Sequence, residues 1–385
     1  MTPRLLAGPD AARVLDRLDR ERADDGVQAT LALVFCSCDH DVEALRAALV
    51  ARGLAVVGAT SAGEIAGAAI LDGGIAVMLW NAPPGSFAVW SGSPGPGGTM
   101  ETAARRLGTA AAERFAHPVV LAFASGVTTD GEAVVRGIQA GAGRAFPLFG
   151  GLAGDDLRMV ETRVFSGDGV FSEGLVGLVL DGDRYHVEGI ATGGWQAVGV
   201  EKQVTRSAAN VVYEIDGEPV LNVYGDYFGL GDLAAETTSI AMDLGVQYPL
   251  SVQRADGTAV IRAPLLSDPE TGGLVFAGAV AEGAHVRFCV PPSLDIVERV
   301  VADAAALRAR LPEADAVLLV SCKARHTALG PLAEDEVEGL AALWRAPLVG
   351  YFSYGEIGAL GAGVCDFHNE TCSVVAVRER APLAA

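Results

Sequence analysis

The chain has 385 residues, of which half are hydrophobic and 20% are charged. A chain of this length predicts about two domains, and this apolar content excludes a largely disordered protein. The 28 basic and 48 acidic residues leave a formal charge of −20, which disfavours nucleic acids and anionic membranes as partners because both are negatively charged.

The N-terminus and the cysteines predict a cytoplasmic protein. Arginine and aspartate interrupt the N-terminal segment where a signal peptide needs an apolar stretch, and no run of about 18 apolar residues could cross a membrane. Six cysteines are too few for a disulfide framework in a chain of this length. We therefore expect a soluble protein in a reducing compartment.

The first predicted elements alternate between strands and helices. In chain order we expect a short helix, a strand, a helix and three strands at 9–23, 30–35, 41–50, 54–59, 74–80 and 87–90. The run at 30–35 is continuously apolar, which is typical of a strand covered on both faces. Asp41 stands where a helix N-cap is needed, ahead of a single apolar stripe.

The same order returns twice further along the chain. The second set is expected at 119–124, 131–142, 146–150, 159–165 and 173–180, and the third at 316–320, 334–344, 348–351 and 372–377. VVGATSAGEI (56–65) and LVGYFSYGEI (348–357) share the frame V-G-x-x-S-x-G-E-I, whereas the middle copy, PLFGGLAGDD, keeps the glycine and an acid but lacks the serine. This similarity predicts an internal duplication.

A different region separates the second and third sets, and Gly193-Gly194-Trp195 marks its start. Extended segments are expected at 202–213, 246–252, 258–262, 273–277 and 285–289. A short helix is expected at 218–225, and an amphipathic helix at 294–311. The predicted fold class is α/β, with mixed sheets built from repeated β-α-β-β units, helices packed on their faces, and N and C regions that are pseudo-repeats of each other.

Acidic residues follow the strands that end in small residues. Glu64, Asp155 and Glu356 are expected at equivalent strand ends, where open α/β sheets commonly bind ligands. An equally good alternative is structural, since a Gly-Glu turn recurs wherever the fold recurs. Ser61 and Ser353 lie one residue too far from the preceding glycine for a nucleophile elbow, which disfavours acyl transfer.

The histidines and glycines exclude several enzyme classes. No H-x-x-x-H or H-E-x-x-H pair and no phosphate-binding glycine loop occurs, so zinc hydrolysis and nucleotide hydrolysis lack support. Cys36, Cys38 and His40 are spaced more tightly than standard zinc ligands. His326 and His368 are expected in loops flanking the last Gly-Glu turn, where each is either a single axial haem ligand or an ordinary histidine.

Several segments together resemble the FIST family of bacterial sensory proteins, which have adjoining FIST N and FIST C regions. They are VVGATSAGEI, FPLFGGLAGDD with SEGLVGLVL, VTRSAANVVYEIDGEPVLNVY, YPLSV, VIRAPL, GAVAEGAHVRF, and LVGYFSYGEIGAL with FHNET. The resemblance covers roughly residues 28–378. It implies a FIST N-like sensory region at 25–208 and a FIST C-like region at 209–380.

The resemblance implies sensing rather than catalysis. FIST modules are fused to, or encoded beside, histidine kinases, cyclic-dinucleotide enzymes and chemoreceptors, and amino acids have been proposed as their ligands. Some members bind haem and sense nitric oxide. No output domain fits in the rest of this chain, so the signal is expected to pass to a separate protein of one of these kinds.

We therefore expect a non-enzymatic sensor that grips an amino acid or related metabolite between its N and C regions. The expected ligand-binding residues are Ser61, Gly63, Glu64, Asp155, Arg325, Ser353, Tyr354, Gly355 and Glu356. The alternatives are a haem-based nitric-oxide sensor, with His326 or His368 as candidate ligand by position only, and an enzyme acting on a small acidic or amino substrate.

Overall fold

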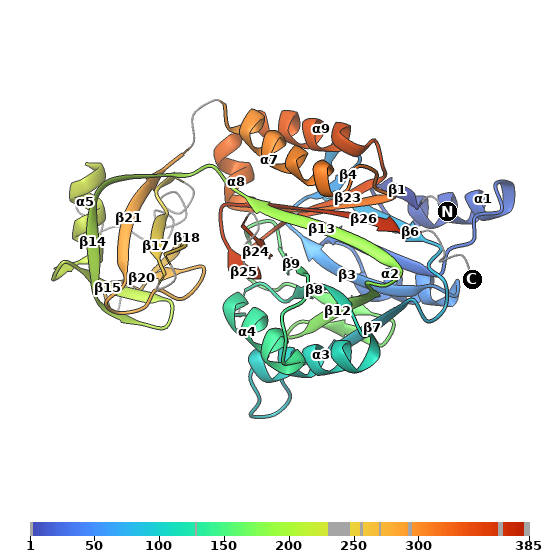
Figure 1. The fold of residues 1–385 in the computed structure, drawn as a ribbon, viewed down its shortest axis with the longest axis horizontal. Coiled ribbons are helices and arrows are strands. Elements are labelled where there is room, and N and C mark those ends of the chain that lie inside the picture. The colour runs from blue at the N-terminus through green and yellow to red at the C-terminus, as the bar shows by residue number, and fades with distance from the viewer. Residues whose placement is uncertain are drawn as a thin grey trace.

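The computed structural model describes residues 3–127, 129–229, 247–254, 257–268, 271–291, 295–360 and 365–380. These residues form a large body, which carries both ends of the chain, and a small lobe at residues 196–290 (Figure 1). The predicted helix 294–311 and strand 246–252 each begin at residues outside the described part of the chain.

The body consists of three copies of one unit, each with an edge strand, a helix, a strand, a helix, a strand, a hairpin and a final strand. The first copy comprises β1 (Arg4–Gly8), α1 (Ala11–Asp24), β2 (Leu31–Ser37), α2 (Val42–Ala51), β3 (Ala55–Ser61), β4 (Glu64–Ala66), β5 (Ala69–Leu71) and β6 (Ile75–Trp80). The second comprises β7 (Phe87–Gly92), α3 (Met100–Arg114), β8 (Pro118–Ala124), α4 (Gly131–Ala142), β9 (Leu148–Leu152), β10 (Val164–Ser166), β11 (Gly169–Phe171) and β12 (Leu175–Asp181). The third comprises β13 (Tyr185–Thr192), α7 (Ile296–Arg310), β22 (Ala316–Cys322), the extra helix α8 (Lys323–Leu329), α9 (Leu332–Trp344), β23 (Leu348–Ser353), β24 (Glu356–Ala359), β25 (Cys365–His368) and β26 (Cys372–Glu379).

Each copy donates its hairpin to the sheet of another copy. The three sheets have the same strand order, which is β1-β6-β2-β3-β10-β11, β7-β12-β8-β9-β24-β25 and β13-β26-β22-β23-β4-β5. Only the central pairs β2/β3, β8/β9 and β22/β23 are parallel, and the other pairs are antiparallel. The predicted α/β class with mixed sheets is therefore confirmed, and the repeat consists of three copies instead of a pair of N and C regions.

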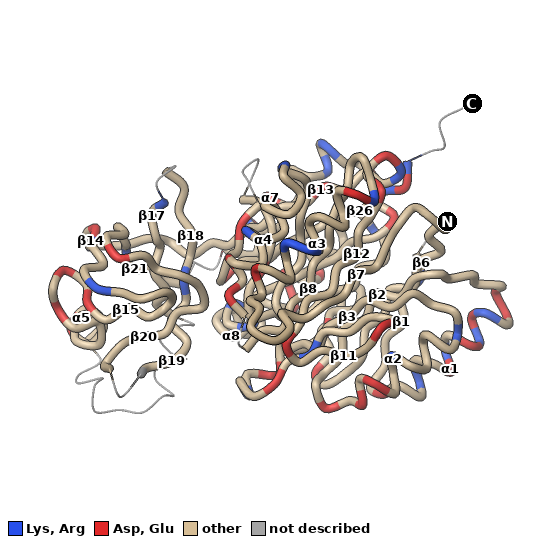
Figure 2. Tube along the Cα trace, turned by 90° about the horizontal axis from the view of Figure 1, so that it is seen from below, with Lys and Arg blue, Asp and Glu red and all other residues tan. Residues whose placement is uncertain are grey.

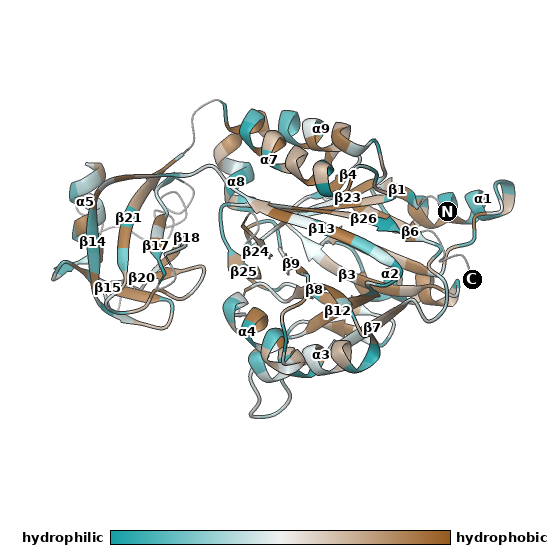
Figure 3. Ribbon diagram, viewed as in Figure 1, coloured by the Kyte–Doolittle hydropathy of each residue, from teal (hydrophilic) through white to brown (hydrophobic). Residues whose placement is uncertain are grey.

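The inner faces of the three sheets share one apolar core. Every residue of β2, β8 and β22 is buried, which confirms the prediction of strands covered on both faces. Phe35, Phe123 and Tyr351 meet in this core, with the Phe35 and Tyr351 rings stacked at 4.4 Å between centroids. The helices cover the outer faces, with α7 and α9 on one side of the body and α3 and α4 on the other, and hydrophobic residues concentrate in the strands (Figures 1 and 3).

The ends of β3, β9 and β23 meet in a closed ring of backbone hydrogen bonds. These bonds are Ala62 N to Phe352 O (2.9 Å), Tyr354 N to Leu152 O (3.4 Å) and Gly154 N to Thr60 O (3.0 Å). The ring places Ala62, Gly154 and Tyr354 at equivalent positions, one in each copy. Asp156, rather than Asp155, is therefore level with Glu64 and Glu356.

The glycine that recurs in this motif is required by close packing. Gly58, Gly150 and Gly350 each lie against the neighbouring parallel strand. A Cβ atom at these positions would lie 2.5, 1.9 and 2.1 Å from a backbone carbonyl oxygen of that strand, which no side chain tolerates. Part of the sequence repeat thus reports strand packing rather than ligand contact.

The small lobe is an insertion in the third copy, between β13 and α7. It comprises β14 (Gln196–Ala208), β15 (Val211–Ile215), β16 (Glu218–Pro219), α5 (Val220–Phe228), β17 (Leu250–Gln253), β18 (Ala259–Arg262), β19 (Pro264–Asp268), β20 (Gly273–Phe276) and β21 (His285–Val290). The predicted boundary at Gly193-Gly194-Trp195 falls between β13 and β14. The proposed domain border at 208/209 falls in the turn between β14 and β15, and strands from both predicted domains share sheets in the body.

The lobe is an antiparallel sheet with its own core. Its strand order is β18-β17-β21-β14-β15-β20-β19, and β16 pairs with β15. Helix α5 packs its buried face on this sheet, where the Tyr224 and Phe288 rings meet edge to face at 4.9 Å. The lobe therefore has an interior separate from that of the body.

Ion pairs hold the lobe against the body. Arg262 at the end of β18 is fully buried and donates to the Glu132 carboxylate of α4 and to the Phe367 carbonyl oxygen (3.2 Å). Arg254 binds Glu132 (2.8 Å) and Asp366 of β25 (2.9 Å). We refer to Arg254, Arg262, Glu132 and Asp366 as the clasp.

The sequence missed several elements. Helix α3 and the three exchanged hairpins were not predicted. The hairpin strands are only three or four residues long, and they gain their hydrogen-bonding partners from another copy. The predicted strand 159–165 is wrong for most of its length, since turns and bends precede β10. Aspartate caps this segment instead, as described below.

Charged residues are spread along the helices and loops of both parts (Figure 2). In the described part of the chain, no helix combines the length and apolar character needed to cross a membrane.

Candidate functional site

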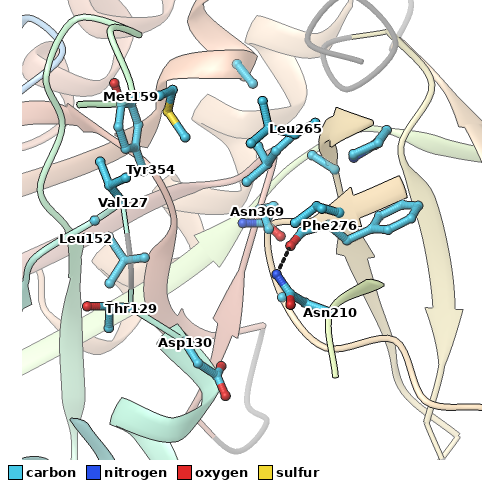
Figure 4. A pocket seen from close by; sticks show the side chains of 18 of the residues that line it. Val127, Thr129, Asp130, Leu152, Met159, Asn210, Leu265, Phe276, Tyr354 and Asn369 are labelled. Atoms are coloured by element: carbon cyan, nitrogen blue, oxygen red, sulfur yellow. Dashed lines mark hydrogen bonds between the residues drawn. The ribbon is translucent and has the colours of Figure 1, made fainter. Parts of the chain in front are cut away.

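A cavity of about 340 Å³ lies between the lobe and the body. Its walls come from both parts (Figure 4). The body contributes Gly126, Val127, Thr129, Asp130, Leu152, Leu157, Met159, Cys322, Lys323, Ala324, Ser353, Tyr354 and Asn369. The lobe contributes Ala209, Asn210, Ala263–Leu266 and Val275–Ala279. The volume suits a small organic molecule.

The body side of the cavity is built by strand ends. The lining segments directly follow β8, β9, β22 and β23, which form two parallel pairs. Parallel strands place their carboxyl ends at one edge of a sheet, where α/β proteins commonly bind ligands. The sequence prediction of a site at these strand ends is consistent with this arrangement, and no contact with a ligand tests it.

The lobe side is mainly apolar. Leu265, Leu266, Val275 and Phe276 face the body across the cavity, with alanines and a proline between them. Asn210 is the polar exception, and its side-chain amide donates to the Phe276 carbonyl oxygen at 2.9 Å (Figure 4). The lobe therefore supplies an apolar cover for whatever occupies the cavity.

Tyr354 organises one wall of the cavity. Its hydroxyl donates to the Asp155 carboxylate and accepts the backbone N–H groups of Asp155 (3.2 Å) and Leu157 (2.7 Å). Burial raises the pKa of Tyr354, and the Asp155 carboxylate raises it further, so this hydroxyl stays protonated. Asp155 in turn accepts the N–H groups of Met159 (3.0 Å) and Val160 (2.7 Å). The two residues shape the loop that brings Leu157 and Met159 to the cavity.

We expect Tyr354→Phe to loosen this loop. The Leu157 N–H loses its acceptor and the Asp155 carboxylate loses a donor, at a cost of about 1–3 kcal/mol. Hydrogen exchange of the peptide 153–163 should accelerate, while exchange in β2 stays unchanged. Tyr227→Phe on α5, where the tyrosine is 38% exposed, is the control and should leave both peptides unaffected. Unchanged exchange in Tyr354→Phe would contradict the assigned role.

The repeated Ser-x-Gly-Glu motif forms internal hydrogen bonds. Ser61 donates to Glu64, and Ser353 donates to Glu356 at 2.5 Å. The second oxygen of Glu64 accepts the Gly74 N–H (2.7 Å), and all four side chains of the motif are fully buried. Burial raises the pKa of Glu64 to about 7 and that of Glu356 to about 8. Only Ser353 of these four lines the cavity.

The glycines of the motif hold the ring at the strand ends. Gly63 accepts the Phe352 N–H and Gly355 accepts the Leu152 N–H, each at 2.8 Å through the backbone carbonyl. Neither glycine lines the cavity. The expected ligand contacts of Gly63, Glu64, Gly355 and Glu356 therefore stay predictions, and the observed contacts of these residues are within the protein.

Arg325 is buried behind the cavity. Its guanidinium pairs with Glu336 of α9, with a second contact of 3.3 Å, and lies 5.6 Å from the centre of the Trp195 ring. Glu336 raises the pKa of Arg325 against the opposing effect of burial. Arg325 is absent from the cavity wall, although Lys323 and Ala324 beside it line the cavity. Its predicted ligand contact also stays a prediction.

Among the described residues, two buried side chains near the cavity have oxygen atoms that accept no hydrogen bond. The Asn369 side chain is 1% exposed, and its amide oxygen accepts no hydrogen bond. The adjacent Glu370 is fully buried and neither carboxylate oxygen accepts one. Burial raises the pKa of Glu370, and the nearby Glu356 raises it further. Asn369 lines the cavity, whereas Glu370 does not.

The geometry does not fit a haem at either candidate histidine. His368 is buried with its Nε2 atom 3.1 Å from the Gly358 carbonyl oxygen. The ring of His326 packs against that of Phe352, with 4.1 Å between centroids. The prediction that both histidines lie in loops is wrong, because His326 is within α8 and His368 ends β25. Burial lowers the pKa of both histidines to about 4. A haem ligand must face an open apolar site, and neither histidine lines the cavity.

Several residues that line the cavity were not predicted from the sequence. Lys323 and Asn369 are polar lining residues, and Leu265, Leu266 and Phe276 form the apolar cover. A compositional signal existed for Lys323, because it is one of only two lysines among 28 basic residues. No local pattern marks the lobe residues, which reach the cavity only through the placement of the inserted lobe.

Comparison with known proteins identifies the family of this chain. The FIST N domain model matches residues 30–218, and the FIST C domain model matches residues 221–359. An uncharacterised protein of Mycobacterium tuberculosis is 27% identical over 371 residues, which cover 92% of each chain. An uncharacterised protein of Mycobacterium bovis is 29% identical over 233 residues, which cover 59% of each chain. FIST domains are sensory domains of signal transduction, and this chain belongs to the FIST family.

Proposed function

We propose that this protein is a small-molecule sensor whose ligand binds in the cavity between the lobe and the body. The observation that carries the proposal is the shared lining, since neither part alone encloses the cavity. A ligand that contacts both parts stabilises the arrangement in which they are close together, and thereby shifts the population toward it.

The structure of the lobe supports a change in its position. The lobe has its own core, interrupts the third copy at one place, and meets the body through the clasp and the cavity walls. Interfaces of this kind permit relative domain motion. Ligand binding adds apolar contacts across the cavity and strengthens the closed arrangement.

The signal then passes to a separate protein. We propose a histidine kinase, a cyclic-dinucleotide enzyme or a chemoreceptor as that partner, and a cytoplasmic setting, on the basis of the family. The ligand class expected from the family is an amino acid or related metabolite. We propose no catalysis, because the buried Ser353 hydroxyl is held by hydrogen bonds to the Glu356 carboxylate and the Ser321 carbonyl oxygen (3.3 Å), and Glu356 is in turn bound by the Thr371 hydroxyl (2.8 Å).

Native mass spectrometry of freshly purified protein tests the proposal, together with small-angle X-ray scattering before and after denaturing removal of bound molecules and refolding. We expect a retained small molecule, and a larger radius of gyration once it is removed. A strong absorbance of the purified protein at about 400 nm would instead identify bound haem. Protein that carries no small molecule, and whose scattering does not respond to extracts of small metabolites, would contradict the proposal.

A further inference from the structure

Lys323 places an unpaired positive charge at the cavity wall. Within the described ranges, its ammonium group has no hydrogen bond and no ion pair, and lies 5.7 Å from the centre of the Phe352 ring. Burial raises the pKa of the nearby Asp156, and Lys323 partly opposes this effect, but the two form no ion pair. The other lysine, Lys202, binds Asp216 at 2.9 Å. A partly buried ammonium without a carboxylate partner favours an anion from outside the protein.

Asn369 is the second unsatisfied polar group of the wall. Its buried amide oxygen needs a hydrogen-bond donor, and Figure 4 shows the side chain between the body and the lobe. An unpaired buried acceptor is costly, so a donor group on a ligand at this point gains a strong contact.

The remaining polar groups of the wall already have protein partners. Thr129 bonds to Ser125 (3.0 Å), and Asp130 accepts the Glu132 N–H (2.9 Å) as the N-cap of α4 and lies 3.6 Å from Arg136. Asn210, Ser353 and Tyr354 are engaged as described above. Within the described residues, each of these side chains thus has at least one partner inside the protein, which Lys323 and the Asn369 amide oxygen lack.

We propose that the cavity binds a small amphipathic monoanion, with an apolar body, a carboxylate paired with Lys323 and a hydrogen-bond donor facing Asn369. This inference rests on the proposed function and specifies its ligand class. A zwitterionic amino acid fits less well, because the one carboxylate among the described lining residues, that of Asp130, already caps α4 and lies 3.6 Å from Arg136. A phosphate dianion would keep a buried charge that a single lysine cannot balance.

Calorimetric titration with matched probes tests the carboxylate. The probes are octanoate, phenylacetate, 4-hydroxyphenylacetate and indole-3-acetate, their uncharged amides, L-tryptophan and inorganic phosphate. We expect at least one carboxylate to bind about tenfold or more tightly than its amide and than L-tryptophan. Lys323→Met should remove that preference, and Lys202→Met, the same substitution at the paired lysine, should preserve it.

A second comparison tests the donor. We expect indole-3-acetate to bind more tightly than 1-methylindole-3-acetate, which lacks the N–H group, or 4-hydroxyphenylacetate more tightly than its methyl ether. Asn369→Ala should abolish this difference. If Asn369→Ala fails to fold, reductive ¹³C-methylation of the wild-type protein provides the readout, because the two lysines give separate signals. Only the Lys323 signal should shift with the carboxylate.

The outcomes separate this inference from the function on which it rests. Amides that bind as tightly as carboxylates, a preference that survives Lys323→Met, or the absence of binding by every carboxylate overturns the monoanion. A neutral or zwitterionic molecule found in the cavity by native mass spectrometry also overturns it, and leaves the sensor function in place. Protein with no retained molecule and no response to extracts counts against both.

Discussion

Replacing Glu132 with alanine is expected to lower the free energy of unfolding by roughly 3–5 kcal/mol and to release the lobe from the body. Glu132 faces two arginines, Arg254 and the fully buried Arg262. Without its carboxylate, the acceptors left to Arg262 among the described residues are the backbone carbonyl groups of Phe367 and Ile261. Most of the lost free energy comes from leaving the Arg262 charge buried without a carboxylate. Separation of the lobe from the body exposes Arg262 to water and removes this cost.

Urea unfolding and small-angle scattering measure the two effects. In Glu132→Ala we expect a lower unfolding midpoint, faster hydrogen exchange in β18 and a larger radius of gyration. Glu43→Ala removes an exposed carboxylate that pairs with Arg46 and should cost at most about 0.5 kcal/mol. The combination of Glu132→Leu with Arg262→Met should recover much of the loss, because it removes both charges. A Glu132→Ala protein no less stable than the Glu43→Ala control would refute the clasp.

Stability is expected to fall as the pH rises from about 4.5 to 8, because of the buried glutamates. The folded protein holds a proton on Glu64 up to a pKa of about 7 and on Glu356 up to about 8, whereas both release it near 4.5 when unfolded. In this window the native state binds more protons than the unfolded state, so each increase in pH favours unfolding. For Glu356 the full loss is on the order of 5 kcal/mol.

The contacts of Glu356 explain why its neutral form is accommodated. A protonated carboxyl can donate to the Ser353 hydroxyl, which is 3.3 Å from the Ser321 carbonyl oxygen. The other oxygen still accepts the hydroxyl of Thr371 (2.8 Å) and its N–H (3.3 Å). Glu370, whose pKa is raised in the same region, acts in the same direction.

Unfolding between pH 5 and 9 in Glu356→Gln measures this effect. Glutamine reproduces the neutral acid, so the variant should match the wild type at pH 5, exceed it at pH 8 and show a smaller slope between them. The lowered pKa values of His326 and His368 give an opposite slope below about 6.5, but this is common to both proteins. Glu334→Gln, at an exposed position of α9, should follow the wild type throughout. Equal slopes in Glu356→Gln and wild type would show that Glu356 is charged when folded.

The parts of the fold that the sequence predicted are those with a local pattern. Buried strands such as 30–35 and 119–124 are continuous apolar runs, and α2 has both a capping aspartate and an apolar stripe. The threefold repeat was visible in the strand–helix order, although only the first and third copies keep the serine. The third equivalence became clear from the backbone ring, which pairs Ala62, Gly154 and Tyr354 across the copies.

The exchanged hairpins had no local signal. The three residues of β4 are hydrogen-bonded to β23, which lies almost three hundred residues away in the chain. Short strands of this kind are determined by the edge that receives them, and that edge is known only when the fold is known. The segment 155–163 failed for a related reason, since its turns depend on the Asp155 carboxylate and the Tyr354 hydroxyl.

The candidate site divides in the same way. Ser353 and Tyr354 were predicted at a strand end and line the cavity, and Asp155 was predicted and supports the wall through Tyr354. The repeated glutamates were predicted from the same motif, yet their observed partners are internal hydroxyl and N–H groups. A repeated acid can be retained for closing a turn as readily as for holding a ligand, and sequence alone does not separate the two.

The hairpin exchange has a consequence for the order of the chain. Because β6 leads to β7 and β12 to β13 in the same way, the strands β26 and β1 stand at the third equivalent junction, and both ends of the chain lie on the same side of the body (Figure 1). A circular permutant that starts at β7 and finishes at β6 keeps every strand pairing. A single unit expressed alone would lack its donated hairpin and present an open sheet edge. The fold is thus the covalent equivalent of a domain-swapped trimer, in which the cyclic succession of units matters and the point of chain entry does not.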